Sequence, residues 1–133
     1  MRVLIFGCNR LSKSLVADLA KDGNQITVLG TERDCLESLA TLNGVRVVLI
    51  AEQMMQDYLQ EGGIDQSDVF LAMSFDDHQN ILVAQIAKYI FNVPKVVCHL
   101  GSPQLQVMYA GLGLDVVGYS FGLMQDVRQA IQE

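Results

Sequence analysis

The segment of residues 7–12 has residue types and a spacing that could bind a phosphate. It reads Gly-Cys-Asn-Arg-Leu-Ser, follows an apolar run and opens an amphipathic stretch. The dinucleotide-binding turn G-x-G-x-x-G has the same place between a strand and a helix, where backbone amides and the helix N-terminus face the phosphates. We therefore expect all six residues to contribute to a nucleotide site: Gly7, Cys8, Asn9, Arg10, Leu11 and Ser12.

Two of the three glycines of that turn are replaced. Gly7 supplies the tight turn, and Asn9 tolerates left-handed backbone geometry well enough to hold the loop. The Asn9 side chain, however, would take space that a pyrophosphate uses, which predicts weaker or different phosphate contacts. Ser12 is small enough to keep helix and strand close, and its hydroxyl could meet an anion. The alternative is a strand-turn-helix corner that needs only one glycine, but the context favours nucleotide binding.

A second position that bears on nucleotide binding is the end of the apolar run 26–29, where Asp or Glu would accept hydrogen bonds from ribose hydroxyls. Gly30 stands there instead. Thr31 or Glu32 could reach a ribose, and Arg33 could accept a 2′-phosphate, although we favour helix capping and solvent exposure for Arg33. The missing carboxylate predicts that Gly30→Asp would strengthen ribose binding by about 1 kcal/mol.

A further polar group follows the apolar run 69–73. Ser74, Asp76 and Asp77 suit the start of a helix, and we expect them to cap one whether or not a ligand binds. Although Asp76, Asp77 and His78 have the composition of a metal cluster, successive helix positions face different directions, so we expect no metal site. His99 ends another run, where it could bind a phosphate or hydrogen-bond to neighbouring backbone.

The elements that position these residues follow from an alternation of apolar runs and helical stretches. Strand-like runs recur at 3–6, 26–29, 45–50, 69–73, 96–98 and, weakly, 116–117. Between them lie helical patterns, the clearest with a predicted buried stripe of Ile81, Leu82, Gln85, Ile86, Tyr89 and Ile90. The alternation predicts a Rossmann-like, doubly wound α/β fold: a mainly parallel sheet of order 3-2-1-4-5, a possible short sixth strand, and helices on both faces.

Length and composition narrow the class of protein. The 133 residues are half hydrophobic, which is enough for one core, so we expect a single domain over 1–133 with a terminal helix at about 121–132. No apolar stretch approaches the roughly 20 residues that cross a bilayer, and no export signal opens the chain, so we expect a cytoplasmic protein. The net charge of −6 with scattered basic residues argues against nucleic acid as a partner.

Three cysteines bear on the redox state of the chain. Cys8, Cys35 and Cys98 are odd in number and have no C-x-x-C spacing. We therefore expect reduced thiols, with neither a disulfide framework nor a zinc site.

Several segments together resemble the N-terminal nucleotide-binding domain of the regulator-of-potassium-conductance family, found in Trk- and Ktr-type uptake systems and some potassium channels. Residues 7–10 match its phosphate turn, including the arginine. Residues 72–80 are similar to its A-x-x-x-D-D-x-x-N, and residues 93–96 and 113–117 match its V-P-x-V and G-A-D-x-V patterns. The chain departs from the family where Asn9, Ser12 and Gly30 stand, and also at Ala51-Glu52, Ser102 and His99.

The resemblance implies a regulatory adenine-nucleotide-binding module, and not an enzyme. Family members bind NAD or NADH, ATP, ADP or AMP, and the departures favour AMP or ADP here. It also implies that Ser74, Asp76, Asn80 and His99 contribute to the site, although Asn80 could instead be an exposed helix residue. Implied partners are a second copy, as a homodimer or larger ring, and a membrane potassium transporter or channel subunit. Such a partner would bring a cytoplasmic domain to the inner membrane.

Two other functions compete with this interpretation. The missing glycines and carboxylate would also suit a degenerate Rossmann scaffold that assembles without binding a ligand. A fragment of an NAD(P)-dependent oxidoreductase ranks lower, because it needs a substrate domain. For assembly, the terminal helix offers an apolar stripe wide enough to serve both its own sheet and a second copy: Phe121, Leu123, Met124, Val127 and Ile131.

Overall fold

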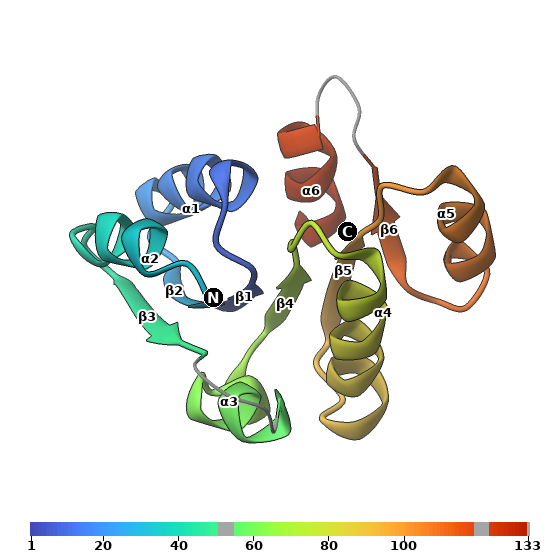
Figure 1. Ribbon diagram of the computed structural model, residues 1–133, viewed down its shortest axis with the longest axis horizontal. Helices are drawn as coiled ribbons and strands as arrows, with labels where there is room; N and C mark the ends of the chain where they lie inside the picture. The colour runs from blue at the N-terminus through green and yellow to red at the C-terminus, as the bar shows by residue number, and fades with distance from the viewer. Residues whose placement is uncertain (51–54, 119–122, 133) are drawn as a thin grey trace.

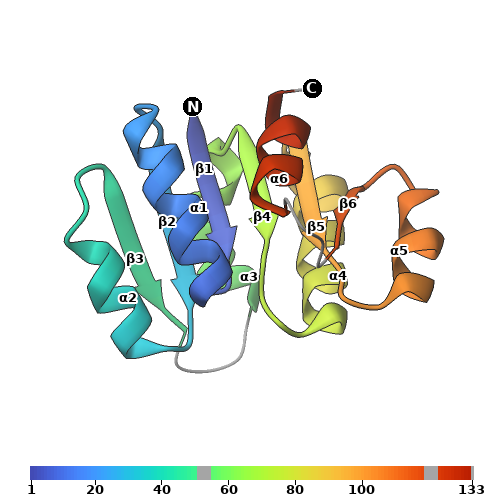
Figure 2. The ribbon, with the colours of Figure 1, turned by 90° about the horizontal axis from the view of Figure 1, so that it is seen from above.

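A six-stranded parallel sheet is the centre of the computed structural model, which describes residues 1–50, 55–118 and 123–132. Its strands are β1 (Arg2–Phe6), β2 (Gln25–Gly30), β3 (Val45–Leu49), β4 (Val69–Ala72), β5 (Lys95–His99) and β6 (Asp115–Val117). They lie side by side in the order β3-β2-β1-β4-β5-β6 (Figure 2). The predicted fold class and strand order, with the short sixth strand, are confirmed.

Helices cover both faces of this sheet (Figure 1). They are α1 (Arg10–Lys21), α2 (Arg33–Ala40), α3 (Met55–Glu61), α4 (Asp77–Gln85), α5 (Pro103–Ala110) and α6 (Leu123–Gln132). The core residues of α1, α2 and α6 pack together on one face, and those of α3 and α4 belong to the cluster on the other, against which partly buried residues of α5 pack. None of the helices in the described ranges has the length and hydropathy that a bilayer-spanning segment needs.

The central strands are apolar because both of their faces are covered. In β1, Val3 and Ile5 belong to one core cluster while Leu4 and Phe6 belong to the other, as period-2 alternation requires. All four side chains are buried. The side chains of such central strands therefore pack in the core, and the polar groups lie in the loops at the carboxyl ends of the strands.

The buried stripe predicted for 81–90 was right at Ile81, which is 7% exposed, and at Ile86, which packs against the core, but wrong at three of its other residues. Leu82, Tyr89 and Ile90 are 51%, 59% and 57% exposed, whereas Val83 and Ala84 are fully buried. Small residues face the sheet because the helix lies close to it, and a π-helical turn at Ile86–Ile90 changes the angular spacing of the side chains that follow α4.

The described part of the terminal helix packs on its own domain. Val127 and Ile131 are 0% and 9% exposed and belong to the core cluster that contains α1. These two residues are therefore not available to a second copy. Phe121 and the side chains of Leu123 and Met124 lie outside the part of the chain that the structure describes.

Candidate functional site

A pocket of about 820 Å³ opens where the sheet order reverses. Its walls come from the loops after β1, β2, β3 and β4, which converge because parallel strands end at the same edge. The size lies in the roughly 300–1,000 Å³ range of small-molecule sites. The pocket residues are Phe6, Gly7, Cys8, Asn9, Arg10, Lys13, Gly30, Thr31, Glu32, Asp34, Cys35, Ile50, Ser74, Phe75, Asp76 and Gln79.

Most of the predicted site residues lie in this wall, and four do not. Leu11 packs against the core cluster beside α1. Ser12, Asn80 and His99 are each 0% exposed. These four residues do not line the pocket, and their contacts with the residues of the pocket wall are described below.

Gly7 is required for two separate reasons. Its φ of +107° lies in the left-handed region, and a Cβ there would stand 2.6 Å from the backbone nitrogen of Ser74. Its amide donates a 2.7 Å hydrogen bond to the Leu29 carbonyl. The turn after β1 is therefore locked between the ends of β2 and β4.

Asn9 caps the helix that follows the turn. Its Oδ1 accepts hydrogen bonds from the amides of Leu11 and Ser12 at 3.0 and 3.1 Å, and its Nδ2 donates to the Met73 carbonyl at 2.9 Å. The expected left-handed backbone is wrong, because φ is −159° and the residue is extended, as an N-cap requires. Two amides that a pyrophosphate would use are thus occupied by the protein itself.

Ser12 completes this cap. The Asn9 amide donates to Ser12 Oγ at 2.9 Å, and the Ser12 hydroxyl donates to the Asn9 carbonyl at 3.1 Å. Since the side chain is also fully buried, its hydroxyl serves the capping box and cannot meet a ligand anion.

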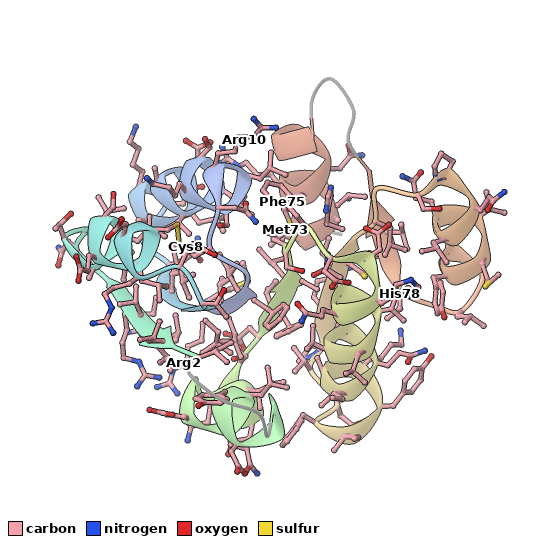
Figure 3. The ribbon with its side chains drawn as sticks, viewed as in Figure 1. Arg2, Cys8, Arg10, Met73, Phe75 and His78 are labelled. Atoms are coloured by element: carbon pink, nitrogen blue, oxygen red, sulfur yellow. A yellow bond between two sulfur atoms is a disulfide. The ribbon has the colours of Figure 1, made fainter. Side chains whose placement is uncertain are left out.

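Positive charge at the pocket comes from one face of α1. Arg10 and Lys13 are both exposed and both line the pocket. Figure 3 shows Arg10 at the beginning of that helix. The i, i+3 spacing places the two side chains side by side, so they can hold a phosphate without the capped amides. Lys13 was missed by the sequence analysis, although this spacing would have indicated it.

A disulfide joins Cys8 in the turn to Cys35 in α2, with a Cα–Cα distance of 6.0 Å (Figure 3). The expectation of three reduced thiols was therefore wrong for this pair. The two cysteines are 27 positions apart, the segment between them contains all of β2, and only the fold brings the two side chains together. Cys98 is a free, buried cysteine, as expected.

Gly30 makes room for this bridge. A Cβ at Gly30 would lie 2.8 Å from Cys8 Cβ and 3.3 Å from the Cys8 amide nitrogen. The expectation that Gly30→Asp would strengthen binding is thus contradicted, because the new side chain would displace the phosphate turn. A glycine stands at position 30 in place of the expected carboxylate, and it leaves the space that the disulfide between Cys8 and Cys35 occupies.

The loop after β4 is held by its own polar side chains. Asn80 Oδ1 accepts from the Ser74 amide and hydroxyl at 3.0 and 2.8 Å, while its Nδ2 donates to the carbonyls of Ser74 and His99 at 2.8 Å each. The alternative of an exposed helix residue is therefore wrong for Asn80. Asp76 Oδ1 accepts from the amides of His78 and Gln79 at 3.0 and 3.1 Å, so Asp76 is the N-cap of α4.

His99 lies beneath this loop with its ring in the interior. Burial lowers the pKa of His99 below its ordinary value, and a backbone hydrogen bond at Ser74 and the charge of Asp77 oppose that shift. A neutral, buried ring behind the wall does not provide a phosphate contact.

The remaining pocket residues were not predicted. They include the exposed Phe75, which is 53% accessible, and Ile50, Asp34 and Gln79. Phe75 and Gln79 lie within the segment 72–80, whereas Ile50 and Asp34 belong to no motif found in the sequence. Position relative to the strand ends was the one available signal, because residues directly after parallel strands share an edge.

Known proteins resemble this chain in sequence. The sequence model of the TrkA-N domain matches residues 3–120. The Trk system potassium uptake protein TrkA of Streptomyces coelicolor is 30% identical over 118 residues, covering 88% of this chain and 52% of that protein. The protein of the same name from Vibrio alginolyticus is 29% identical over 104 residues, which is 78% of this chain and 22% of that protein. The chain thus spans about half of the first relative and less of the second.

Solved structures share the fold across nearly the full chain. The NAD(P)-binding domain of an exopolyphosphatase-related protein from Archaeoglobus fulgidus superimposes with a TM-score of 0.74 at 17% identity, covering 98% of this chain and 96% of that one. The TrkA-N domain of the inner membrane protein ybaL from Escherichia coli gives 0.73 at 16% identity, with coverages of 98% and 94%.

Proposed function

Because the chain belongs to the TrkA-N domain family, we propose that it is a regulatory domain that binds an adenine nucleotide and controls a potassium transport system. The observation that carries this proposal is the pocket at the carboxyl ends of β1, β2 and β4, with Arg10 and Lys13 in its wall. A nucleotide phosphate is the anion that this edge of a Rossmann sheet suits. The cations and the N-terminus of α1 would attract it together.

The ligand we favour is AMP or ADP, with ATP and NAD(H) as less suitable ones. Asn9 already satisfies the amides of Leu11 and Ser12, which leaves less backbone for a buried pyrophosphate. Arg10 and Lys13 are long and exposed, and they can follow a terminal phosphate instead. Gly30 offers no carboxylate to the ribose, so Thr31 and Glu32 are the polar residues of that wall.

Regulation would work through binding alone. A ligand shifts a conformational equilibrium only as far as it binds the two states differently, so the pocket must touch an element that moves. We propose a homodimer or larger ring at the cytoplasmic face of a potassium transporter or channel subunit, in keeping with the names of the relatives. Residues 1–133 would serve as one domain of that assembly, without catalysis.

The second candidate function is a scaffold that binds no ligand, and the capping hydrogen bonds of Asn9 are the observation that favours it. A turn in which side chains of the protein already accept hydrogen bonds from the amides of Asn9, Leu11 and Ser12 is stable when empty. A scaffold would keep the sheet and the capping box, and it would make no use of Arg10 or Lys13.

Calorimetric titration with AMP, ADP, ATP and NADH separates the two candidates. We expect AMP or ADP to bind, and Arg10→Gln to weaken binding about tenfold, as the loss of one charge-assisted hydrogen bond does. Arg33→Gln is the matched control, because Arg33 begins α2 but does not line the pocket. Absence of heat with all four ligands would reject nucleotide binding and favour the scaffold, whereas equal losses in both variants would show that the nucleotide binds outside this pocket.

A further inference from the structure

We propose that Cys8 and Cys35 form a thiol–disulfide exchange site in the pocket wall, which a dithiol reductant opens and a small disulfide oxidant closes. The consequence is a nucleotide affinity that depends on the redox state, and this consequence rests on the proposed function. The exchange reaction itself does not, because it concerns only the two sulfur atoms and their access.

The position of the bridge gives a reductant access to it. Both cysteines line the pocket, and Cys35 is partly exposed while Cys8 is 6% exposed. The third cysteine differs sharply, because Cys98 is fully buried and burial raises the pKa of its thiol to about 12. The chain thus carries a reactive pair and an internal control within one domain.

The bridge joins one firmly held element to one weakly held element. The turn at Cys8 is fixed by the Gly7 amide on Leu29 and by Asn9 on Met73. Helix α2 begins at Arg33, and the side chain of its N-cap, Glu32, makes no capping hydrogen bond. The helix is anchored mainly through Leu36 and Leu39. Breaking the bridge would therefore free the beginning of α2 and leave the phosphate turn in place.

The bond changes are those of ordinary exchange. A thiolate of the reductant attacks Sγ of Cys35, the more exposed of the two residues, and the electron pair of the broken bond leaves with Sγ of Cys8. That thiolate forms beside the start of α1, where the helix dipole favours negative charge, and then takes a proton. The second thiol of the reductant displaces Cys35, so the protein gains two thiols and the reductant becomes a disulfide. Oxidation by a small disulfide is the reverse.

Reduction should widen the pocket. Two unbonded sulfur atoms need more room than a bonded pair, and Gly30 leaves no side chain between the turn and α2 that could hold them together. The wall that carries Thr31 and Glu32 would then move away from the turn. The nucleotide affinities of the reduced and the bridged forms should therefore differ. In the reducing cytoplasm proposed above, bridges are typically transient and redox-sensing.

Alkylation of the folded protein tests the exchange site. The full chain is oxidised with oxidised glutathione, treated with iodoacetamide with or without prior dithiothreitol, and analysed by peptide mass. We expect no modification before reduction, and modification of Cys8 and Cys35 but not of Cys98 after it. Modification of the pair in the oxidised sample, or a bridge that survives dithiothreitol until the protein unfolds, would overturn the proposal.

Binding of ADP to the two forms tests the consequence. We expect the affinities of the two forms to differ by at least about fivefold, the lower end of coupling between sites. Cys35→Ser should bind like the reduced form under both conditions, and Cys98→Ala should respond like the native chain. Equal affinity in both redox forms would refute the coupling. If neither form binds ADP, AMP, ATP or NADH, the proposed function fails, and the alkylation pattern still decides the exchange site.

Discussion

The Asp77 carboxylate accepts a hydrogen bond from the Gly101 amide at the carboxyl edge of the sheet. Its Oδ1 accepts the Gly101 amide at 2.8 Å, and its Oδ2 accepts the Ser102 amide at 3.0 Å. Ser102 is the N-cap of α5, and Asp77 is the first residue of α4. One carboxylate therefore joins the loops after β4 and β5, which are 24 residues apart in the chain.

This contact predicts a difference between two adjacent aspartates. Asp77→Asn should destabilise the protein by about 1–2 kcal/mol, because an amide NH2 group would face a backbone N–H in place of one carboxylate oxygen. Asp76→Asn is the matched control and should cost little, since a single oxygen of Asp76 accepts both capping bonds and Asn caps helices equally well. Urea unfolding measures both. Equal costs would mean that the Asp77 bridge contributes nothing of its own.

Replacing Asn9 should exchange stability for phosphate affinity. Asn9→Gly frees the amides of Leu11 and Ser12, and we expect ADP to bind about tenfold more tightly, as one or two charge-assisted hydrogen bonds would allow. The loss of the cap and of the bond to Met73 should cost about 1 kcal/mol of stability. Calorimetry and urea unfolding measure the two effects.

Asn9→Asp is the control for this prediction. It keeps an acceptor for both amides but replaces the donor to the Met73 carbonyl with an oxygen, so it should lose stability as Asn9→Gly does, while its negative charge weakens ADP binding. An unchanged affinity in Asn9→Gly would show that the phosphate does not approach the start of α1.

Gly30 should tolerate no side chain. Gly30→Ala places a Cβ 2.8 Å from Cys8 Cβ, and overpacking of this kind costs about 1–3 kcal/mol. Gly111→Ala is the matched control, because the nearest atom to its added Cβ is the Met108 carbonyl oxygen at 3.7 Å. Thermal unfolding of the two variants decides the matter. A Gly30→Ala protein as stable as Gly111→Ala would mean that the turn moves without cost.

The buried His99 predicts an acid-sensitive stability. Above about pH 6.5 the ring is neutral in both the folded and the unfolded chain. As the pH falls below that value, the unfolded chain takes up a proton that the folded one resists, because burial lowers the pKa of His99. Stability should therefore fall with pH, by at most about 1.4 kcal/mol per unit for one proton.

Variants at the two histidines identify the source of this dependence. His99→Gln should remove the dependence of stability on pH just below pH 6.5, even if the substitution itself changes the stability of the protein. His78→Gln should retain the slope, because His78 is exposed. Urea unfolding at several pH values measures it, and a slope that persists in His99→Gln would assign the proton to another group.

The architecture was predictable because it depends on patterns that are local. Apolar runs such as 3–6 and 69–72 alternate with amphipathic stretches, and that period fixes strand, helix and parallel order before any contact is known. The turn at Gly7 and the cap at Asp76 were predictable for the same reason, since each acts within a few residues of itself.

Only the tertiary structure determined which side chains and which covalent bond form the wall of the pocket. Cys8 meets Cys35 only because β1 pairs with β2 and α2 returns over the sheet, so composition and spacing wrongly indicated free thiols. Gly30 was interpreted as a missing carboxylate, and the fold shows it to be the space into which Cys8 packs. Asn80 and His99 were placed at the site by their positions in the chain, but burial turned their polar groups inward, because groups beneath a loop must satisfy its backbone before any ligand.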